Sequence, residues 1–146
     1  MVQPIPEGYR TVTPYLVVPD AGALIEFLER AFHAEETERT AAPDGRVMHA
    51  AVRIGDSMVM MGGASERHPP RPGTIYLYVP DADAAYERAL AAGATSLMEP
   101  ADQFYGDRNG GVEDLWGNQW WIGTHVEDVP PDELERRHRE ARGEAG

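Results

Sequence analysis

The chain has 146 residues, of which 42% are hydrophobic and 26% charged, and it carries a formal net charge of −12 with a pI near 4.7. This length and composition suit a single globular domain, and the acidic balance argues against nucleic acid or an anionic membrane surface as a partner, because both bind clustered Lys and Arg. The absence of cysteine excludes disulfides and Cys-ligated zinc, and with no apolar run long enough to span a membrane and no basic, apolar leader we expect a cytoplasmic protein.

The first predicted unit consists of a strand, a helix and three further strands. Alternating apolar residues predict the first strand, and apolar residues at helical spacing after a possible N-cap at Asp20 predict the helix. The later strands follow from alternation and from turn signals at Asp44-Gly45 and Gly55-Asp56. The ranges expected for these five elements are about 11–18, 21–32, 35–40, 46–54 and 57–61.

A repeat organises the rest of the chain. Tyr15-Leu16-Val17-Val18-Pro19-Asp20 returns as Tyr76-Leu77-Tyr78-Val79-Pro80-Asp81, with five of six positions identical and an offset of 61 residues (76 − 15). A repeat at fixed spacing indicates two copies of one structural unit. We therefore divide the chain into module one at about 11–63, a Pro-rich linker at 64–73, module two at about 74–126 and a charged C-terminal helix at about 131–141.

Module two is expected to repeat the order of elements in module one. Its first strand begins at Thr74, a helix follows over about 83–92, and an edge strand is expected over 94–99. The segment 101–111, which contains Phe104-Tyr105-Gly106-Asp107-Arg108, is interpreted as a longer loop. The last strand is expected over 119–126.

These elements predict an α+β domain: two βαβββ modules that form one curved, eight-stranded mixed sheet around a cleft, with the helices on its outer face. Alternation places Leu16, Val18, Ile75, Leu77 and Val79 under the helices. The opposite face would carry tyrosines, His49 and Met60 rather than charges. Such a face encloses a ligand or packs against a partner.

The segment Val112-Glu113-Asp114-Leu115-Trp116-Gly117-Asn118-Gln119-Trp120-Trp121 carries a family resemblance. It is similar to the Glu-Asp-Pro-x-Gly-Asn turn before the last strand in the vicinal oxygen chelate superfamily, which includes glyoxalase I, bleomycin-resistance proteins and extradiol dioxygenases; Leu115 replaces the usual Pro. Tyr105-Gly106-Asp107-Arg108 and the strand at His49 resemble an uncharacterised glyoxalase-like subgroup. The resemblance covers about 11–126 and implies the fold above, whereas function varies widely on one fold.

Metal-dependent members of that superfamily bind a divalent metal through four His or Glu side chains that face the cavity. The matching positions in this chain are Thr13, Met60, Thr74 and Trp121. None supplies the imidazole or carboxylate that such a metal prefers. The resemblance therefore implies no metal at the standard site, no cofactor and no glyoxalase I activity, with one divalent metal at a non-standard site as the alternative.

Two residues are the main candidates for chemistry. His49 is expected on the cavity face, where it could act as a catalytic acid or base or be a hydrogen-bonded structural residue. Arg108 could bind an anionic or carbonyl group, or pair with Asp107 to fix a loop. The adjacent carboxylates of Glu113 and Asp114 are interpreted as a turn device rather than a catalytic dyad.

Aromatic residues predict a small-molecule pocket. By alternation Trp120 and Trp121 cannot both face the cavity. The resemblance places Trp121 at a metal-ligand position, which implies that Trp121 faces the cavity and Trp120 the core. The predicted ligand-binding residues are Tyr15, Met60, Tyr76, Tyr78, Phe104, Tyr105, Arg108 and Trp121. The alternative is that this face is buried in a dimer.

Three functions follow. We favour a metal-free binding protein of the bleomycin-resistance type that sequesters an aromatic or planar ligand. The second is an enzyme, such as a lyase, an isomerase or a dioxygenase-like protein, that uses His49 as acid/base or in a relocated metal site with Glu35 or Glu113. The third is a dimeric interaction module without a ligand. A homodimer is the expected assembly, because many relatives complete their clefts with a second chain.

Overall fold

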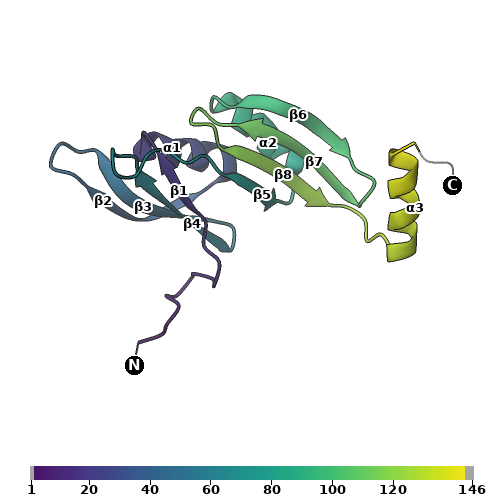
Figure 1. Cartoon of the computed structure of the whole chain (residues 1–146), viewed down its shortest axis with the longest axis horizontal. Coiled ribbons are helices and arrows are strands. Elements are labelled where there is room, and N and C mark those ends of the chain that lie inside the picture. Colours follow the sequence, from purple (N-terminus) through teal and green to yellow (C-terminus); the bar gives the residue numbers. More distant parts are fainter. Residues whose placement is uncertain (1, 144–146) are drawn as a thin grey trace.

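The computed structural model describes residues 2–143, and within them the chain forms two βαβββ modules and a terminal helix (Figure 1). Module one contains β1 (Tyr15–Val18), α1 (Ala21–Phe32), β2 (Glu35–Ala41), β3 (Val47–Ile54) and β4 (Ser57–Gly63). Module two contains β5 (Thr74–Tyr78), α2 (Ala82–Ala91), β6 (Thr95–Asp102), β7 (Asp107–Glu113) and β8 (Gln119–His125), and α3 (Pro131–Ala141) follows. The predicted α+β class and the two modules are confirmed.

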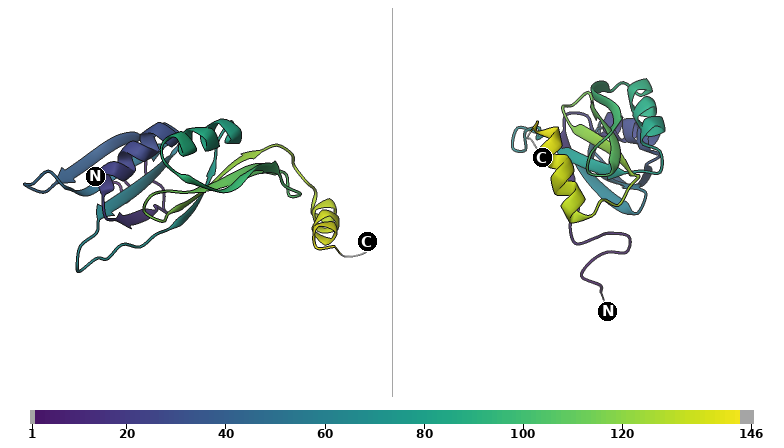
Figure 2. Two further views of the ribbon diagram at one scale, coloured as in Figure 1. Left: turned by 90° about the horizontal axis from the view of Figure 1, so that it is seen from above. Right: turned by 90° about the vertical axis from the view of Figure 1, so that its right-hand side faces the viewer.

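The strands form two four-stranded sheets with matching orders, β1-β4-β3-β2 and β5-β8-β7-β6. In each sheet the first strand pairs parallel with the last, and the other pairs are antiparallel. Over residues 2–143 the eight strands thus divide into two sheets instead of the one continuous sheet expected from the sequence. Figure 2 shows α1 and α2 next to each other on one side of both sheets, so the modules join through their helices.

The repeat extends to strand pairing. Tyr15 lies opposite Met60, and Tyr76 lies opposite Trp121, which keeps the offset of 61 residues in both strands (76 − 15 and 121 − 60). Val17 opposite Gly62 and Tyr78 opposite Gly123 follow the same rule. The two modules therefore present equivalent positions on equivalent faces.

One hydrophobic core lies between the helices and both sheets. The carboxylates of Asp20 and Asp81 cap α1 and α2 by accepting hydrogen bonds from backbone amides at 3.0 and 3.1 Å. The Phe32 ring of α1 meets the fully buried Trp120 ring of β8 at a centroid distance of 5.5 Å. Burial of each large apolar side chain contributes about 1.5–3 kcal/mol, which fixes the helices to the sheets. Trp120 is a core residue, as predicted.

The turn before β8 is organised by Asp114. Its buried carboxylate accepts hydrogen bonds from the backbone amides of Trp116 and Asn118, from the Asn118 side chain and from Trp120 Nε1, each at 2.9 Å. Asn118 Oδ1 in turn accepts a hydrogen bond from the Gly73 amide at 2.9 Å, which ties the linker to this turn. This arrangement confirms the turn role expected for Asp114.

The loop expected over 101–111 is wrong, because most of that segment belongs to the β6–β7 hairpin. β6 continues to Asp102 and β7 begins at Asp107. Gly110 and Gly111 lie within β7, where glycine is required for close packing. A Cβ atom at Gly111 would lie 2.5 Å from the Trp121 ring, and one at Gly110 would lie 2.9 Å from the carbonyl oxygen of Met98.

The alternation expected along β3 also fails, at Met48. Thr40 lies opposite His49 and the next residue, Ala41, lies opposite Val47, so Met48 is an extra residue in a β-bulge. As a result Val47 is buried in the core, whereas Met48 is 53% exposed. The bulge brings Met48 to a surface that the simple alternation did not predict.

The linker runs along the outer edge of β1. The Arg71 amide donates a hydrogen bond to the carbonyl oxygen of Val17 at 3.0 Å, which forms a single antiparallel bridge. Within residues 2–143 no helix has both the length and the apolar character needed to cross a membrane.

Candidate functional site

The tyrosines of the repeat lie on the sheet faces turned away from the helices. The side chains of Tyr15, Tyr76 and Tyr78 are 51%, 41% and 67% exposed, while the alternate residues Leu16 and Val18 are buried. Two of these rings lie across glycines of the neighbouring strand. A Cβ atom at Gly62 would come within 2.6 Å of the Tyr15 hydroxyl, and one at Gly123 within 2.3 Å of the Tyr76 hydroxyl.

In module one, His49 lies between a tyrosine and a carboxylate. Its ring stacks on Tyr15 at 5.8 Å, its Nδ1 is 3.4 Å from the Tyr15 hydroxyl, and its Nε2 is 3.3 Å from Glu38 Oε1. Glu38 is not among the partners predicted for His49 from the sequence. The expected partners are elsewhere, since Glu35 pairs with Arg53 and Glu113 is in module two. Within one chain, His49 is therefore brought together with neither Glu35 nor Glu113, the carboxylates predicted for a relocated metal site.

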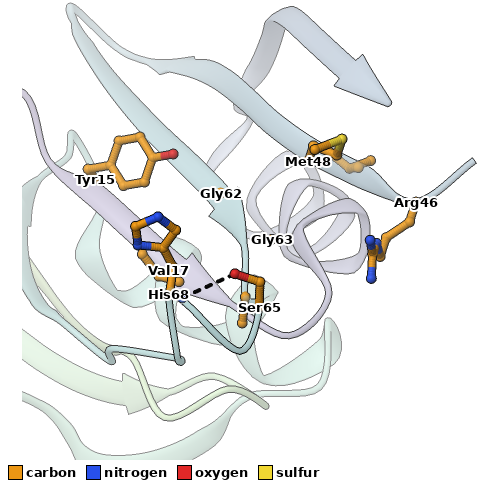
Figure 3. Close-up of a pocket in the computed structure, with 10 residues that line it drawn as sticks. Tyr15, Val17, Arg46, Met48, Gly62, Gly63, Ser65 and His68 are labelled. Atoms are coloured by element: carbon orange, nitrogen blue, oxygen red, sulfur yellow. Dashed lines mark hydrogen bonds between the residues drawn. The ribbon is translucent and has the colours of Figure 1, made fainter. Parts of the chain in front are cut away.

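A hollow of about 400 Å³ lies beside Tyr15 (Figure 3). Gly62 and Gly63 of β4 form part of its wall, and Tyr15, Ser65 and His68 lie together on one side. Arg46 and Met48, from the start of β3, lie on the other side. We call this cavity the module-one hollow.

In module two, a buried carboxylate connects the exposed tyrosines. Asp107, which is 4% exposed, accepts hydrogen bonds from the hydroxyls of Tyr76 at 2.7 Å and Tyr78 at 3.0 Å, and it lies 2.9 Å from His125 Nδ1. Burial alone raises the pKa of Asp107, but the hydrogen bonds from His125 and the two tyrosines outweigh it, so its pKa lies below the ordinary value. Asp107 is therefore held as a carboxylate.

His125 lies between two carboxylates. Besides Asp107, it approaches Asp128 Oδ1 through Nε2 at 2.7 Å. Hydrogen bonds to Asp107 and then to Asp128 raise the pKa of His125, which favours the imidazolium.

Asn109 extends this network toward the β6–β7 loop. Its side chain is 2% exposed, and its Nδ2 donates hydrogen bonds to the hydroxyls of Tyr76 at 3.0 Å and Tyr105 at 2.7 Å. Within residues 2–143 its Oδ1 has no hydrogen-bond partner. Burial is the main cause of the raised pKa of Tyr76, and its hydrogen bond to Asp107 adds to it. We call Asp107, Tyr76, Tyr78, His125 and Asn109 the Asp107 network.

Arg108 lies on the opposite face of β7 from its neighbour Asp107. Its guanidinium donates hydrogen bonds to both oxygens of Asp83 on α2, at 2.8 and 3.0 Å, and lies 3.4 Å from Asp102. Asp83 and Asp102 raise the pKa of Arg108. The geometry thus supports neither the predicted contact between Arg108 and a ligand nor the alternative pairing with Asp107.

The eight predicted ligand-binding residues do not line one cavity. Tyr15 lines the module-one hollow, whereas Tyr76 and Tyr78 line a second hollow of about 720 Å³ between β5 and the β3–β4 turn. The Phe104 ring stacks against His138 of α3 at 5.4 Å and lies in a third hollow formed with that helix. Within one chain these four residues therefore line three separate hollows, and their role in ligand binding stays a prediction.

Two other predicted residues occupy equivalent, half-buried positions. Met60 lies opposite Tyr15 on β4, and Trp121 lies opposite Tyr76 on β8. The Trp121 ring covers Gly111, and its Nε1 donates to Gln119 Oε1 at 3.3 Å. Both side chains therefore lie beside the tyrosines, on the face expected from alternation.

Comparison with known proteins agrees with this fold. The family model described as the Glyoxalase/Bleomycin resistance protein/Dioxygenase superfamily matches residues 10–122. The chain belongs to this superfamily. Uncharacterised proteins from Mycobacterium tuberculosis (strain ATCC 25618 / H37Rv) and Mycobacterium bovis (strain ATCC BAA-935 / AF2122/97) are each 41% identical over 135 residues, which span 85% of this chain and 79% and 89% of those proteins, respectively.

Solved structures of the superfamily resemble the chain over most of its length. TioX from Micromonospora sp. ML1 has a TM-score of 0.70 and 25% identity, covering 80% of this chain and 99% of TioX. A superfamily member from Sphaerobacter thermophilus DSM 20745 has a TM-score of 0.64 and 21% identity, covering 79% of this chain and 96% of that protein.

The donor set expected of metal-dependent superfamily members does not fit this chain. Thr13 lies before β1, where its hydroxyl donates to the carbonyl oxygen of Arg10 at 3.1 Å, and Met60, Thr74 and Trp121 offer no strong donor for a divalent metal. Across residues 2–143, no three His, Asp or Glu side chains are grouped as metal ligands would be.

Sequence reasoning missed Asn109 and Glu38. Asn109 is the module-two equivalent of His49. His49 lies opposite Gly62, and Asn109 lies opposite Gly123, which is equivalent to Gly62 in the repeat. Alignment of the modules by strand pairing would have matched Asn109 to His49, at an offset of 60 residues (109 − 49) rather than 61. A one-residue difference between the modules hid this match.

Proposed function

We propose that the chain binds a planar, aromatic small molecule in a cleft bounded by the tyrosine-bearing sheet faces. The observation that carries this proposal is the set of large aromatic side chains that remain exposed opposite the helices, two of them lying over glycines. Exposed apolar surface of this kind is unfavourable in water unless something covers it. Aromatic rings stack on planar ligands and polar groups at their edges select the orientation, as in most small-molecule sites.

The proposed binding unit is a homodimer. Each face is only four strands wide and open on the side away from the helices, so one module supplies half of a cleft. A second copy would bring another tyrosine-bearing face opposite the first, and a twofold axis would create two equivalent clefts. Sedimentation equilibrium tests this part, and a monomer at all accessible concentrations would exclude it.

Binding can be tested with N-phenyl-1-naphthylamine, an uncharged aromatic probe whose fluorescence increases in apolar sites. We expect saturable binding by the native protein and at least about tenfold weaker binding by Tyr15→Ala, because a stacked aromatic pair and its buried area are lost. Leu115→Ala is the control, since Leu115 is an exposed apolar residue of the Asp114 turn and lies on neither face. Absence of saturable binding, or equal affinity in Tyr15→Ala, would contradict the proposal.

The second candidate is an acid–base enzyme, favoured by the position of His49 between Tyr15 and Glu38. A carboxylate on one ring nitrogen can orient a histidine whose other nitrogen handles a proton. The two candidates differ in turnover. An aromatic compound retained by a binding protein is recovered unchanged, whereas an enzyme converts it, and conversion is lost in His49→Gln while binding remains.

A further inference from the structure

Some arginines of this chain have carboxylate or carbonyl partners and others have none. All 13 basic residues are arginine, against 25 acidic residues. Six of them form ion pairs with carboxylates, and Arg30 and Arg88 donate to backbone carbonyl oxygens. Among residues 2–143, the arginines whose guanidinium groups have neither an ion pair nor a hydrogen bond are Arg10, Arg46, Arg67 and Arg71.

Three of these four arginines are at or near the module-one hollow. Arg46 lines it directly. Arg67 precedes His68, which also lines it, and the Arg71 amide bonds to Val17, another lining residue. Glu66 lies between the lining residue Ser65 and Arg67, so the positive character of the hollow rests on Arg46, which lines it and has no carboxylate partner.

The residues that line the hollow carry no negative charge. Within the described part of the chain the lining includes Arg46 and His68 but no Asp or Glu. The nearest acid in sequence to Arg46 is Asp44, and its Oδ1 accepts a hydrogen bond from the Arg46 backbone amide at 2.9 Å and not from the guanidinium. The second hollow, near Tyr76, differs because Glu35 and Asp56 contribute to its lining.

The rest of the hollow suits a flat aromatic body. Gly62 lets the Tyr15 ring lie close to β4, and this ring stands at one side of the hollow, across from Met48 and Arg46 (Figure 3). Met48 reaches this site because of the β3 bulge, and its polarizable thioether packs well against aromatic rings. A volume of about 400 Å³ lies within the range of small-molecule sites.

We propose that the module-one hollow binds an aromatic anion, meaning a planar ring system that bears a carboxylate, sulfonate or phosphate group. The ring lies against Tyr15, and the anionic group binds the guanidinium of Arg46. A guanidinium binds such groups through paired, charge-assisted hydrogen bonds. This inference rests on the proposed function and specifies the ligand class for the same face.

A matched pair of probes tests the inference. 1-Anilinonaphthalene-8-sulfonate has the aromatic body of N-phenyl-1-naphthylamine plus one sulfonate group. We expect Arg46→Gln to weaken binding of the sulfonate at least about tenfold while binding of the uncharged probe changes less than about twofold. Arg10→Gln is the matched control, because Arg10 is equally unpaired but does not line the hollow. Raising the salt concentration should weaken binding of the sulfonate probe and leave binding of the uncharged probe unchanged.

The possible outcomes separate the two proposals. If both probes bind and Arg46→Gln affects them equally, or no more than Arg10→Gln does, the aromatic-anion inference is wrong while the proposed binding function stands. If neither probe binds the native protein, both are wrong. Unfolding in urea provides the check on structure, since Arg46→Gln and native protein should unfold at the same midpoint.

Discussion

Replacement of Asp107 by Asn gives the most direct test of the Asp107 network. The carboxylate accepts hydrogen bonds from two tyrosine hydroxyls and pairs with His125 while being almost fully buried. An amide has the same shape, but it has one acceptor atom, and its NH₂ group must face at least one of the donors. Hydrogen bonds to charged groups contribute about 1.5–3 kcal/mol each, so loss of one or two lowers the free energy of unfolding by about 2–4 kcal/mol.

The measurement is urea unfolding followed by tryptophan fluorescence at pH 6. Thermal unfolding gives a second readout. For a chain of this size, each kcal/mol lost from the free energy of unfolding lowers Tm by about 2–4 °C, so Asp107→Asn should lower Tm by roughly 5–15 °C. Asp102→Asn is the matched control, because the Asp102 carboxylate is 77% exposed. A decrease for Asp107→Asn below about 1 kcal/mol, or equal to that of the control, would refute the role assigned to this network.

The difference between native protein and Asp107→Asn should also depend on pH. The pKa of Asp107 is lowered by folding, so its stabilising effect is present above its ordinary pKa near 3.9 and is lost as the pH falls through the lower folded value. The pKa of His125 is raised, so its effect is complete below its ordinary pKa near 6.5 and is lost as the pH rises through the higher folded value. The difference should therefore be largest between about pH 4 and 6.5.

Other substitutions test the turn, the glycines and the corrected position of Arg108. Asp114→Ala should cost about 3–5 kcal/mol in urea unfolding, because it leaves several buried donors unpaired, whereas Glu113→Ala should change stability by less than about 0.5 kcal/mol. Gly62→Ala should weaken naphthylamine binding with little loss of stability, since its Cβ would displace a mobile ring, whereas Gly63→Ala meets a backbone carbonyl oxygen at 2.7 Å and should cost about 1–3 kcal/mol. Arg108→Ala should leave naphthylamine binding unchanged and increase amide exchange at the start of α2, where its partner Asp83 lies. Weaker naphthylamine binding by this variant would show that Arg108 contacts the ligand.

Features that depend on neighbouring residues could be predicted from the sequence. The repeat gave the two modules, apolar periodicity gave α1, and the role of Asp114 followed from its place in a short turn. These signals lie within a few residues or at a fixed offset, so no knowledge of packing is needed. The opposite directions of Trp120 and Trp121 followed from strand alternation alone.

Features that depend on contacts between distant strands could not be predicted. Gly110 and Gly111 have the composition of a loop, and only the Trp121 ring across the sheet explains glycine within β7. The position of Arg108 depends on where β7 begins, so the missed strand also hid its pairing with Asp83. Met48 is exposed because β3 forms a bulge where it pairs with β2. The register of this pairing could not be predicted from the sequence of β2.

The bridge between Arg71 and Val17 has a consequence for self-association. Edge strands with free amides and carbonyls are templates for pairing with other chains. β1 is the outer strand of its sheet, and the linker lies along it with prolines at positions 69, 70 and 72, which have no amide hydrogen to donate. The linker therefore covers the edge of β1 at Val17 and offers few backbone amide donors to another chain. It protects module one against strand addition and also connects the two modules.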